Sequence, residues 1–207
     1  MDCHLVALLG SPRREGNTAI LLQEAIRGSE DAGCIVELIW VPGLRIKPCM
    51  EIFVCKQKPV CAIKDEMQVY YDMIRDADGL IVATPVMTMG VPGALKSFID
   101  RFQVFYMAKY ERRDPLVTPD QRKVRKMLIL SIAGMNIKNL FAGLLQTMHA
   151  FSEIIDCPLW DKLLRDDMDT IRDITTRPEL LKEAYAKGYA LGEAIKRAQS
   201  EVALAVE

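Results

Sequence analysis

The segment from Leu5 to Thr18, LVALLGSPRREGNT, constrains the fold of this chain more than any other stretch. An apolar run ends at Gly10, a short polar loop follows, and apolar residues at helical spacing begin after Asn17 and Thr18. This order predicts a buried strand, a loop and a helix. Backbone N–H groups, loop hydroxyls and the positive end of the helix dipole would converge on one point, which favours a bound phosphate. The alternative is an ordinary strand–helix loop with capping residues, because short Gly, Ser and Asn loops are common there.

The loop differs from the other common phosphate-binding loops. Five residues separate Gly10 from Gly16, and Asn17 occupies the place of the lysine in a Walker A loop. The dinucleotide fingerprint GxGxxG is absent, and the loop has no cysteine that could act as a phosphatase nucleophile. The segment resembles the G-S-x-R-x-x-G-N-T loop of the NADPH-dependent FMN reductase family, which cradles the FMN phosphate. The resemblance implies that the phosphate is held by Ser11, Arg13, Gly16, Asn17 and Thr18.

Composition and charge narrow the possible classes of protein. The chain has 207 residues, is half apolar, and carries a net charge of −1. This length suits one α/β domain, and the near-neutral charge gives no reason to expect binding to nucleic acid or to a membrane. We see neither a signal peptide nor a membrane-spanning run, so we expect a cytoplasmic protein with reduced cysteines. Cys3, Cys34 and Cys157, in or beside predicted strands, are expected to be small core residues.

Strands and helices alternate along the rest of the chain. Together with the first strand, residues 34–41, 80–84, 127–132 and part of 154–164 are predicted strands, and helices are predicted at 65–76, 91–107, 139–152 and from 178 onward. Residues 42–64 and 109–126 are predicted to be loops. The alternation predicts one flavodoxin-like α/β domain over residues 1–207, a three-layer sandwich whose five-stranded parallel sheet has the order 2-1-3-4-5 and helices on both faces. Ligands of such sheets bind beyond the carboxyl ends of the strands, so the loops after strands one, three and four should form the site.

The loop after the predicted third strand reads TPVMTMGVPG and is followed by ALKSFIDR. It resembles the family signature s-P-v-Y followed further on by K-x-F-I-D-R, and Met87 stands where many relatives carry tyrosine. A methionine thioether can still cover a ring face, although a loop methionine that merely packs is the alternative. The resemblance implies that the isoalloxazine ring is held by Pro85, Val86, Met87, Thr88, Met89 and Gly90. Gly134, after the fourth strand, is expected on the ribityl or ring side.

Several charged features are expected to be structural. Asp65 is predicted to cap the helix that follows, with Gln68 as its capping-box partner. Asp100 and Arg101 are expected to form a pair that fixes a helix end. The acidic turn over residues 166–169 is expected to flank a helix, because it lacks the ligand spacing of a calcium loop.

Three cysteines, Cys49, Cys55 and Cys61, lie in the long loop over residues 42–64. Zinc is disfavoured because zinc ligands usually come as CxxC pairs. The loop resembles the insertion of the iron–sulfur flavoproteins, a branch of the same superfamily, whose C-x2-C-x2-C-x5-C motif binds a [4Fe–4S] cluster. The resemblance implies that the three cysteines are iron ligands, with Ile52 in place of the second cysteine. A cluster held by three thiolates and a loop that has lost its cluster both stay open.

The resemblance to the NADPH-dependent FMN reductase and iron–sulfur flavoprotein superfamily implies an FMN-binding oxidoreductase. Such a protein passes electrons from NAD(P)H through FMN to a small-molecule or protein acceptor. The flavin N5 atom carries the chemistry, so no catalytic side chain is expected. The alternative function is an iron–sulfur flavoprotein that acts as an electron-transfer module fed by a protein partner such as ferredoxin. The resemblance also implies a homodimer or homotetramer.

Overall fold

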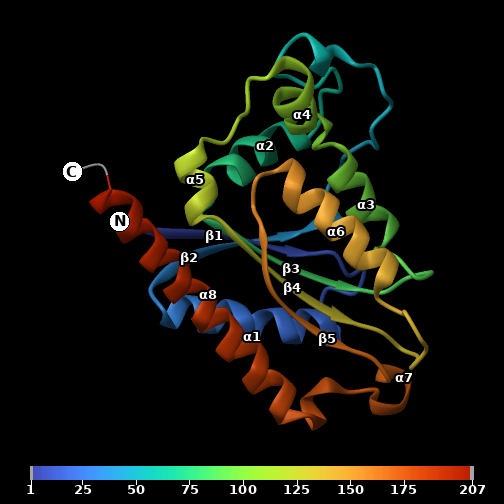
Figure 1. Ribbon diagram of the computed structural model, residues 1–207. Helices are drawn as coiled ribbons and strands as arrows, with labels where there is room; N and C mark the ends of the chain where they lie inside the picture. Colours follow the sequence, from blue (N-terminus) through green and yellow to red (C-terminus); the bar gives the residue numbers. More distant parts are fainter. Residues whose placement is uncertain (1, 206–207) are drawn as a thin grey trace.

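Five parallel strands form one sheet in the order β2-β1-β3-β4-β5, as the sequence predicts (Figure 1). The computed structural model describes residues 2–205 of the chain. The central strands β3 and β4 are almost entirely buried, which matches their near-continuous apolar sequences. The strand bounds are β1 Cys3–Leu9, β2 Cys34–Trp40, β3 Gly79–Pro85, β4 Lys126–Ile132 and β5 Leu159–Arg165.

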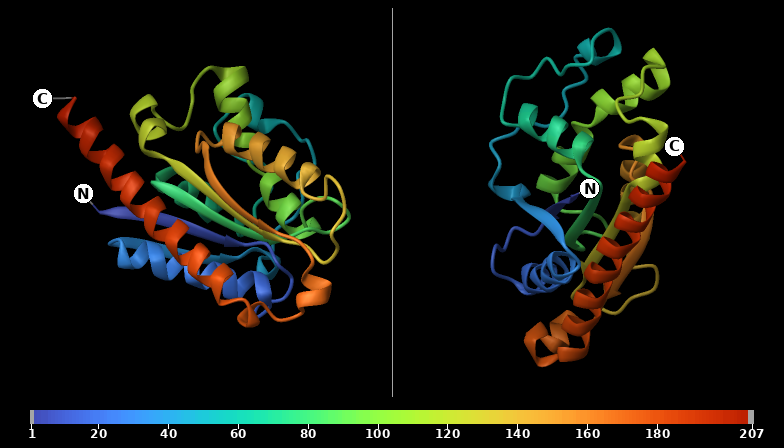
Figure 2. Two further views of the ribbon diagram at one scale, coloured as in Figure 1. Left: turned by 60° about the horizontal axis from the view of Figure 1, so that its bottom comes forward. Right: turned by 90° about the vertical axis from the view of Figure 1, so that its left-hand side faces the viewer.

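Helices cover both faces of the sheet, and the sheet separates two apolar cores (Figures 1 and 2). One face is covered by α1 (Asn17–Asp31) and α8 (Pro178–Leu204). The other face is covered by α2 (Met67–Asp76), α3 (Gly93–Asp100), α4 (Gln103–Tyr106) and α6 (Ala142–Ile154). The predicted three-layer flavodoxin-like sandwich is therefore confirmed.

Helices α1 and α8 pack unusually closely because each contributes a glycine to the contact. A Cβ atom at Gly188 would lie 1.9 Å from the carbonyl oxygen of Ala25, and one at Gly28 would lie 2.1 Å from that of Tyr185. The Ser29 hydroxyl, which lies between them, donates to the Gly188 carbonyl oxygen at 2.9 Å. These small residues let two backbones approach where longer side chains would hold them apart.

The segment predicted as a loop over residues 109–126 is partly helical, so that prediction is wrong. It contains the end of a π-helical turn, η3 (Met107–Arg112), and the helix α5 (Pro119–Val124). The start of α5 is a capping box, in which Thr118 accepts from the backbone of Gln121 and the Gln121 side chain accepts from the backbone of Thr118. The predicted helix over residues 91–107 is also divided between α3 and α4.

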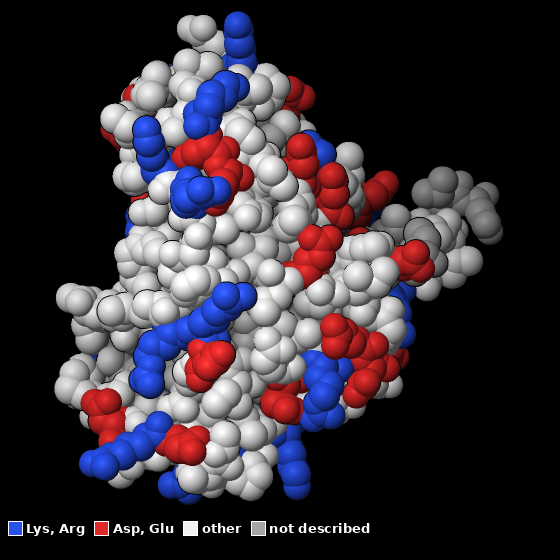
Figure 3. Space-filling view, turned by 180° about the vertical axis from the view of Figure 1, so that it is seen from behind, with Lys and Arg blue, Asp and Glu red and all other residues white. Residues whose placement is uncertain are grey.

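The remaining short elements lie in the connections. They are the 3-10 turns η1 (Val41–Gly43), η2 (Val54–Lys56) and η4 (Ile174–Thr176) and the helix α7 (Met168–Ile171). No helix within residues 2–205 combines the length and the apolar character needed to cross a bilayer. Acidic and basic side chains are interspersed over the face seen in Figure 3.

Cys3 and Cys34 form a disulfide, which corrects the expectation that both are reduced core residues. The two residues lie opposite each other in the register of β1 and β2, with their Cα atoms 4.5 Å apart. This separation is within the range that a disulfide spans. Cys157 is a buried free cysteine, as expected. The pairing depends on strand register, which the spacing of the two cysteines in the sequence does not reveal.

Candidate functional site

A pocket of about 480 Å³ opens at the carboxyl ends of β1, β3 and β4. It is lined by residues of the three loops that the sequence singled out. The predicted cofactor residues in the lining are Ser11, Arg13, Gly16, Asn17, Thr18, Pro85, Val86, Met87 and Gly134. The other three predicted residues, Thr88, Met89 and Gly90, belong to the second loop but do not line this pocket.

The first loop leaves the start of α1 without a side-chain cap. Gly16 is the N-cap residue, its backbone is extended, and no side chain accepts from the first N–H groups of the helix. A Cβ atom at Gly16 would lie 3.1 Å from the Arg13 Cβ, so glycine makes room for the arginine side chain. Uncapped N–H groups at the positive end of a helix dipole, beside an arginine, form a site for an anion.

Ser11 is held in place from two sides. Its hydroxyl accepts from the backbone N–H of Arg13 at 3.2 Å, and its carbonyl accepts from the indole N–H of Trp40 at 3.0 Å. Ser11 and Thr18 are both buried in the loop. The structure therefore brings the hydroxyl-bearing residues, the arginine and the helix start to one end of the pocket.

The Asn17 side chain binds a segment from the far end of the chain. Its amide nitrogen donates to the Arg172 carbonyl at 2.7 Å, and its amide oxygen accepts from the Ile174 N–H at 3.2 Å. Both polar ends of the side chain are thus engaged, and any contact with a phosphate would come from its backbone N–H. The segment that Asn17 holds also carries Asp169 to the pocket.

Sequence reasoning missed the contribution of Arg172 and Asp169 to this pocket. The acidic turn flanks the helix α7 and Asp169 is exposed, as expected, but the Asp169 carboxylate also lies against the pocket, where a Cβ atom at Gly134 would be 2.5 Å from its oxygens. Arg172, with a φ of 61°, ends α7 in a backbone conformation that is uncommon for a residue with a side chain. The signal that could have found both residues is their position directly after β5, at the same edge of the sheet.

The second loop forms a tight turn at the pocket rim. Met87 and Gly90 exchange backbone hydrogen bonds of 2.9 and 3.0 Å, and Thr88 and Met89 between them have φ values of 50° and 61°. Left-handed conformations in such residues cost energy and cluster at ligand sites. The Met87 side chain is 49% exposed, so its thioether is free to cover a bound ring.

The predicted FMN fits this pocket by the chemistry of its two ends. One end offers helix N–H groups and Arg13 for a phosphate. The other offers the apolar Val86 and Met87 for a flat ring, and Gly134 lies in the lining with the Asp169 carboxylate directly against it. Small-molecule pockets typically combine an apolar lining with a few placed polar groups, as here.

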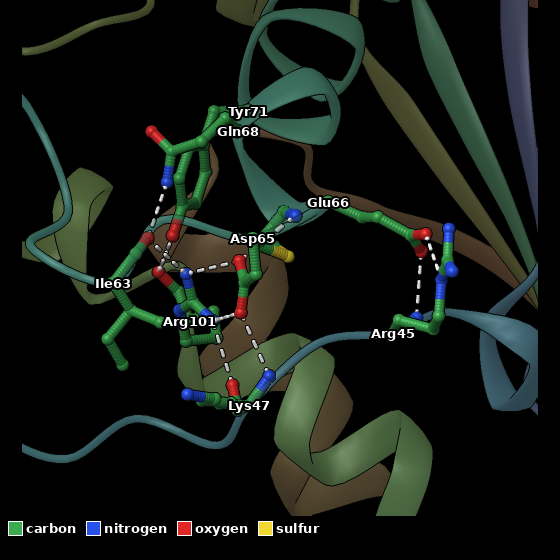
Figure 4. Close-up of polar contacts among 9 residues, drawn as sticks. Arg45, Lys47, Ile63, Asp65, Glu66, Gln68, Tyr71 and Arg101 are labelled. Carbon is green, nitrogen blue, oxygen red and sulfur yellow. Dashed lines mark hydrogen bonds and ion pairs between the residues drawn. The ribbon is translucent and has the colours of Figure 1, made fainter.

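The cysteine loop, defined as residues 44–66, is closed by Arg101 (Figure 4). The Arg101 guanidinium donates to the Lys47 carbonyl at 2.8 Å and to the Asp65 carboxylate at 2.7 and 3.0 Å. The ion pair is buried, with side chains that are 0% and 8% exposed. Burial alone would raise the pKa of Asp65, but the hydrogen bonds from Arg101, Lys47 and Met67 lower it below its usual value.

Two structural expectations change here. Arg101 is structural, but its partner is Asp65, whereas Asp100 pairs with Lys96 at 2.6 Å. The predicted capping box is absent, because Gln68 donates instead to the Ile63 carbonyl at 2.9 Å. The Asp65 carboxylate joins segments that are far apart in sequence. Local capping patterns consider only neighbouring residues, so they cannot predict this contact.

Cys49, Cys55 and Cys61 line one small cavity under the cysteine loop, together with Ile52 and Arg101. Burial raises the pKa of the Cys55 thiol. Within residues 2–205, no group of three His, Cys, Asp or Glu side chains is placed to hold a metal ion. A cluster spreads its ligands over several iron atoms and so separates them more widely than one ion does. The donor type suits a cluster, but the cavity of about 20 Å³ has room for little more than a water molecule, and Ile52 leaves one position without a thiolate.

The model of the NADPH-dependent FMN reductase family matches residues 3–158 of the chain. The chain belongs to this family. It is 36% identical over 107 residues to an iron–sulfur flavoprotein of Archaeoglobus fulgidus, covering 52% of this chain and 54% of that protein. It is 34% identical over 97 residues to an iron–sulfur flavoprotein of Methanocaldococcus jannaschii, covering 47% of this chain and 50% of that protein. The matches thus span about half the length of these curated relatives.

The fold is shared with solved flavoenzyme structures. The NAD(P)H:quinone oxidoreductase from Methanothermobacter marburgensis superposes with a TM-score of 0.71 at 19% identity, covering 92% of this chain and all of that one. At this identity the likeness supports the flavodoxin-like fold alone. The expected superfamily and fold are both confirmed.

Proposed function

We propose that this member of the FMN reductase family binds FMN in the 480 Å³ pocket and transfers electrons from NAD(P)H to an acceptor. The observation that carries the proposal is the meeting of the three strand-end loops around one pocket. The family name and the names of its structural neighbours support a reduced nicotinamide as the electron donor. The acceptor is a small molecule or a protein.

The residues of the chain act by binding and orienting. Ser11, Thr18 and the uncapped helix start would hold the phosphate, and Arg13 would balance its charge. The turn from Met87 to Gly90 would present backbone groups and an apolar side chain to the ring. Bound FMN would supply the hydride-accepting N5 atom, which exchanges one or two electrons. No side chain is assigned a catalytic role.

A second candidate function is an iron–sulfur flavoprotein that receives electrons from a protein partner such as ferredoxin. Two observations favour it: Cys49, Cys55 and Cys61 share one cavity, and the two relatives described above are named iron–sulfur flavoproteins. A [4Fe–4S] cluster beside a flavin would divide two-electron transfer into one-electron steps. In this proposal the three cysteines are the iron ligands.

Location and assembly belong to the same proposal. A reduced nicotinamide donor is an intracellular metabolite, which supports a cytoplasmic location. The open rim of the pocket, with the exposed Met87 and Met89 beside it, supports a homodimer or homotetramer in which a second copy covers the flavin.

The test is anaerobic rapid mixing of the FMN-loaded protein with NADPH, NADH or reduced ferredoxin, followed by flavin absorbance. Rapid bleaching by a nicotinamide supports the reductase. Bleaching by ferredoxin alone supports the electron-transfer module and rejects the reductase. A protein that binds no FMN contradicts both functions.

A further inference from the structure

The lining of the 480 Å³ pocket includes a carboxylate, that of Asp169 in the first turn of α7. Both carboxylate oxygens would lie 2.5 Å from a Cβ atom at Gly134, so the carboxylate rests directly on this glycine. Asp169 is exposed, and within residues 2–205 it takes part in no ion pair. Its oxygens can therefore accept hydrogen bonds from a ligand in the pocket.

Backbone contacts at both ends of α7 hold Asp169 in this position. The Asp169 N–H donates to the Gly134 carbonyl at 3.0 Å, which ties the start of α7 to the loop after β4. At the other end, the Arg172 carbonyl accepts from the Asn17 amide at 2.7 Å, which ties the segment to the start of α1. Helix α7 itself lies beyond the carboxyl end of β5 (Figure 1). The segment therefore connects the expected phosphate end of the pocket with the loop after β4, and Asp169 lies at the β4 side.

The position of the carboxylate decides which part of FMN it can meet. The phosphate would bind at the loop after β1, and β3 separates β1 from β4, the strand that Gly134 follows. Adjacent strands are about 4.8 Å apart, so the loops after β1 and β4 begin roughly 10 Å from each other. The carboxylate is thus kept from close contact with the phosphate, whose charge has the same sign. It accepts hydrogen bonds and donates none, and the ribityl chain carries hydroxyl donors between the phosphate and the ring.

We propose that the Asp169 carboxylate binds the ribityl hydroxyl groups of FMN, and that glycine at position 134 leaves the space that the carboxylate occupies. This inference rests on the proposed function. Hydrogen bonds to a charged acceptor are stronger than those between neutral groups. Asp169 accordingly favours ligands that carry hydroxyl donors next to a flat ring, and it contributes nothing to the binding of the ring itself.

The experiment titrates the flavin-free protein with FMN, riboflavin and lumiflavin and follows the flavin fluorescence. Riboflavin lacks the phosphate, and lumiflavin has the same ring with a methyl group in place of the ribityl chain. The variants are Asp169→Ala, which removes the acceptor, and Asp169→Asn, which keeps one acceptor oxygen without the charge. The matched control is Asp166→Ala, because Asp166 belongs to the same acidic turn but does not line the pocket.

We expect Asp169→Ala to bind riboflavin about tenfold more weakly, because one hydrogen bond to a charged group contributes about that factor, and to bind lumiflavin with unchanged affinity. Asp169→Asn should fall between Asp169→Ala and the unaltered protein, and Asp166→Ala should match the unaltered protein. Unchanged affinity for FMN and riboflavin in both Asp169 variants overturns the inference and leaves FMN binding standing. An equal loss for riboflavin and lumiflavin also overturns it, because the carboxylate would then act through the ring or through the fold. An unaltered protein that binds no FMN overturns the proposed function and the inference with it.

Discussion

Replacement of Asp65 by asparagine tests the claim that a buried ion pair closes the cysteine loop. The Asp65 carboxylate accepts from Arg101 and from the backbone N–H groups of Lys47 at 2.9 Å and Met67 at 3.2 Å. Asparagine has nearly the same shape but no charge. In Asp65→Asn the buried guanidinium of Arg101 would therefore keep its position without a counter-charge.

The structure sets the size of the expected effect. Removing one partner of a buried pair costs about 3–5 kcal/mol, because the remaining charge is left uncompensated. Asparagine still accepts one hydrogen bond, so we expect a loss of about 3 kcal/mol in the free energy of unfolding. For a chain of this size, that loss lowers the melting temperature by roughly 6–12 °C.

The matched control is Glu66→Gln, one residue further along the loop. Glu66 pairs with Arg45 at 2.8 Å, but the two side chains are 36% and 90% exposed. An exposed pair contributes about 0–1 kcal/mol, so this variant should be nearly as stable as the unaltered protein. Urea unfolding of both variants measures the difference. Equal losses of stability in the two would refute the reasoning.

The same pair predicts a dependence of stability on pH. Because the pKa of Asp65 is lowered in the folded chain, its contribution to stability is present above the unfolded value of about 3.9. That contribution is lost as the pH falls through the lower pKa of the folded state. The free energy of unfolding, measured across the acidic range, should therefore fall more steeply with decreasing pH for the unaltered protein than for Asp65→Asn.

Three further changes test other parts of the structure. Asn17→Ala should weaken FMN binding by about tenfold, or about 1.4 kcal/mol, because it releases the segment that its amide holds; an unchanged Kd in a fluorescence titration would contradict this. Gly188→Ala should cost at least about 1–3 kcal/mol by forcing α8 from α1, whereas Gly93→Ala, with open space around it, serves as the control in thermal unfolding. Cys3→Ser should lower the free energy of unfolding by about 3–4 kcal/mol, because it removes the disulfide to Cys34. A reductant should destabilise the unaltered protein and have no further effect on Cys3→Ser. Equal sensitivity to reductant in both proteins would reject the disulfide.

Local patterns in the sequence predict the sheet and the edge at which the site lies. The run that ends at Gly10, followed by the helix from Asn17, is enough to identify a strand-end loop. Alternation of apolar strands with helices then predicts a parallel sheet, because parallel strands need helical crossovers, and five strands suggest the order that the structure has. The same rule explains why residues from three separate loops meet in one pocket. Their roles in binding FMN stay predictions.

Contacts between segments that are far apart in the chain could not be predicted from local sequence patterns. Asp65 and Arg101 are 36 residues apart, and each also has a plausible partner nearby in the chain. The bond between Asn17 and Arg172 spans 155 residues and depends on where β5 releases the chain. Cys3 and Cys34 become partners only when β1 and β2 adopt their register. In each case the deciding information is the folded geometry.

The central claim, that this pocket binds FMN by its phosphate, is tested most directly by titrating the flavin-free protein with FMN and with riboflavin. The two ligands share the ring and the ribityl chain and differ only in the phosphate. With at least one charge-assisted hydrogen bond to the phosphate besides the helix dipole, FMN should bind roughly 100-fold more tightly, or about 2.7 kcal/mol. Equal affinities for the two flavins, or binding of neither, would contradict the account.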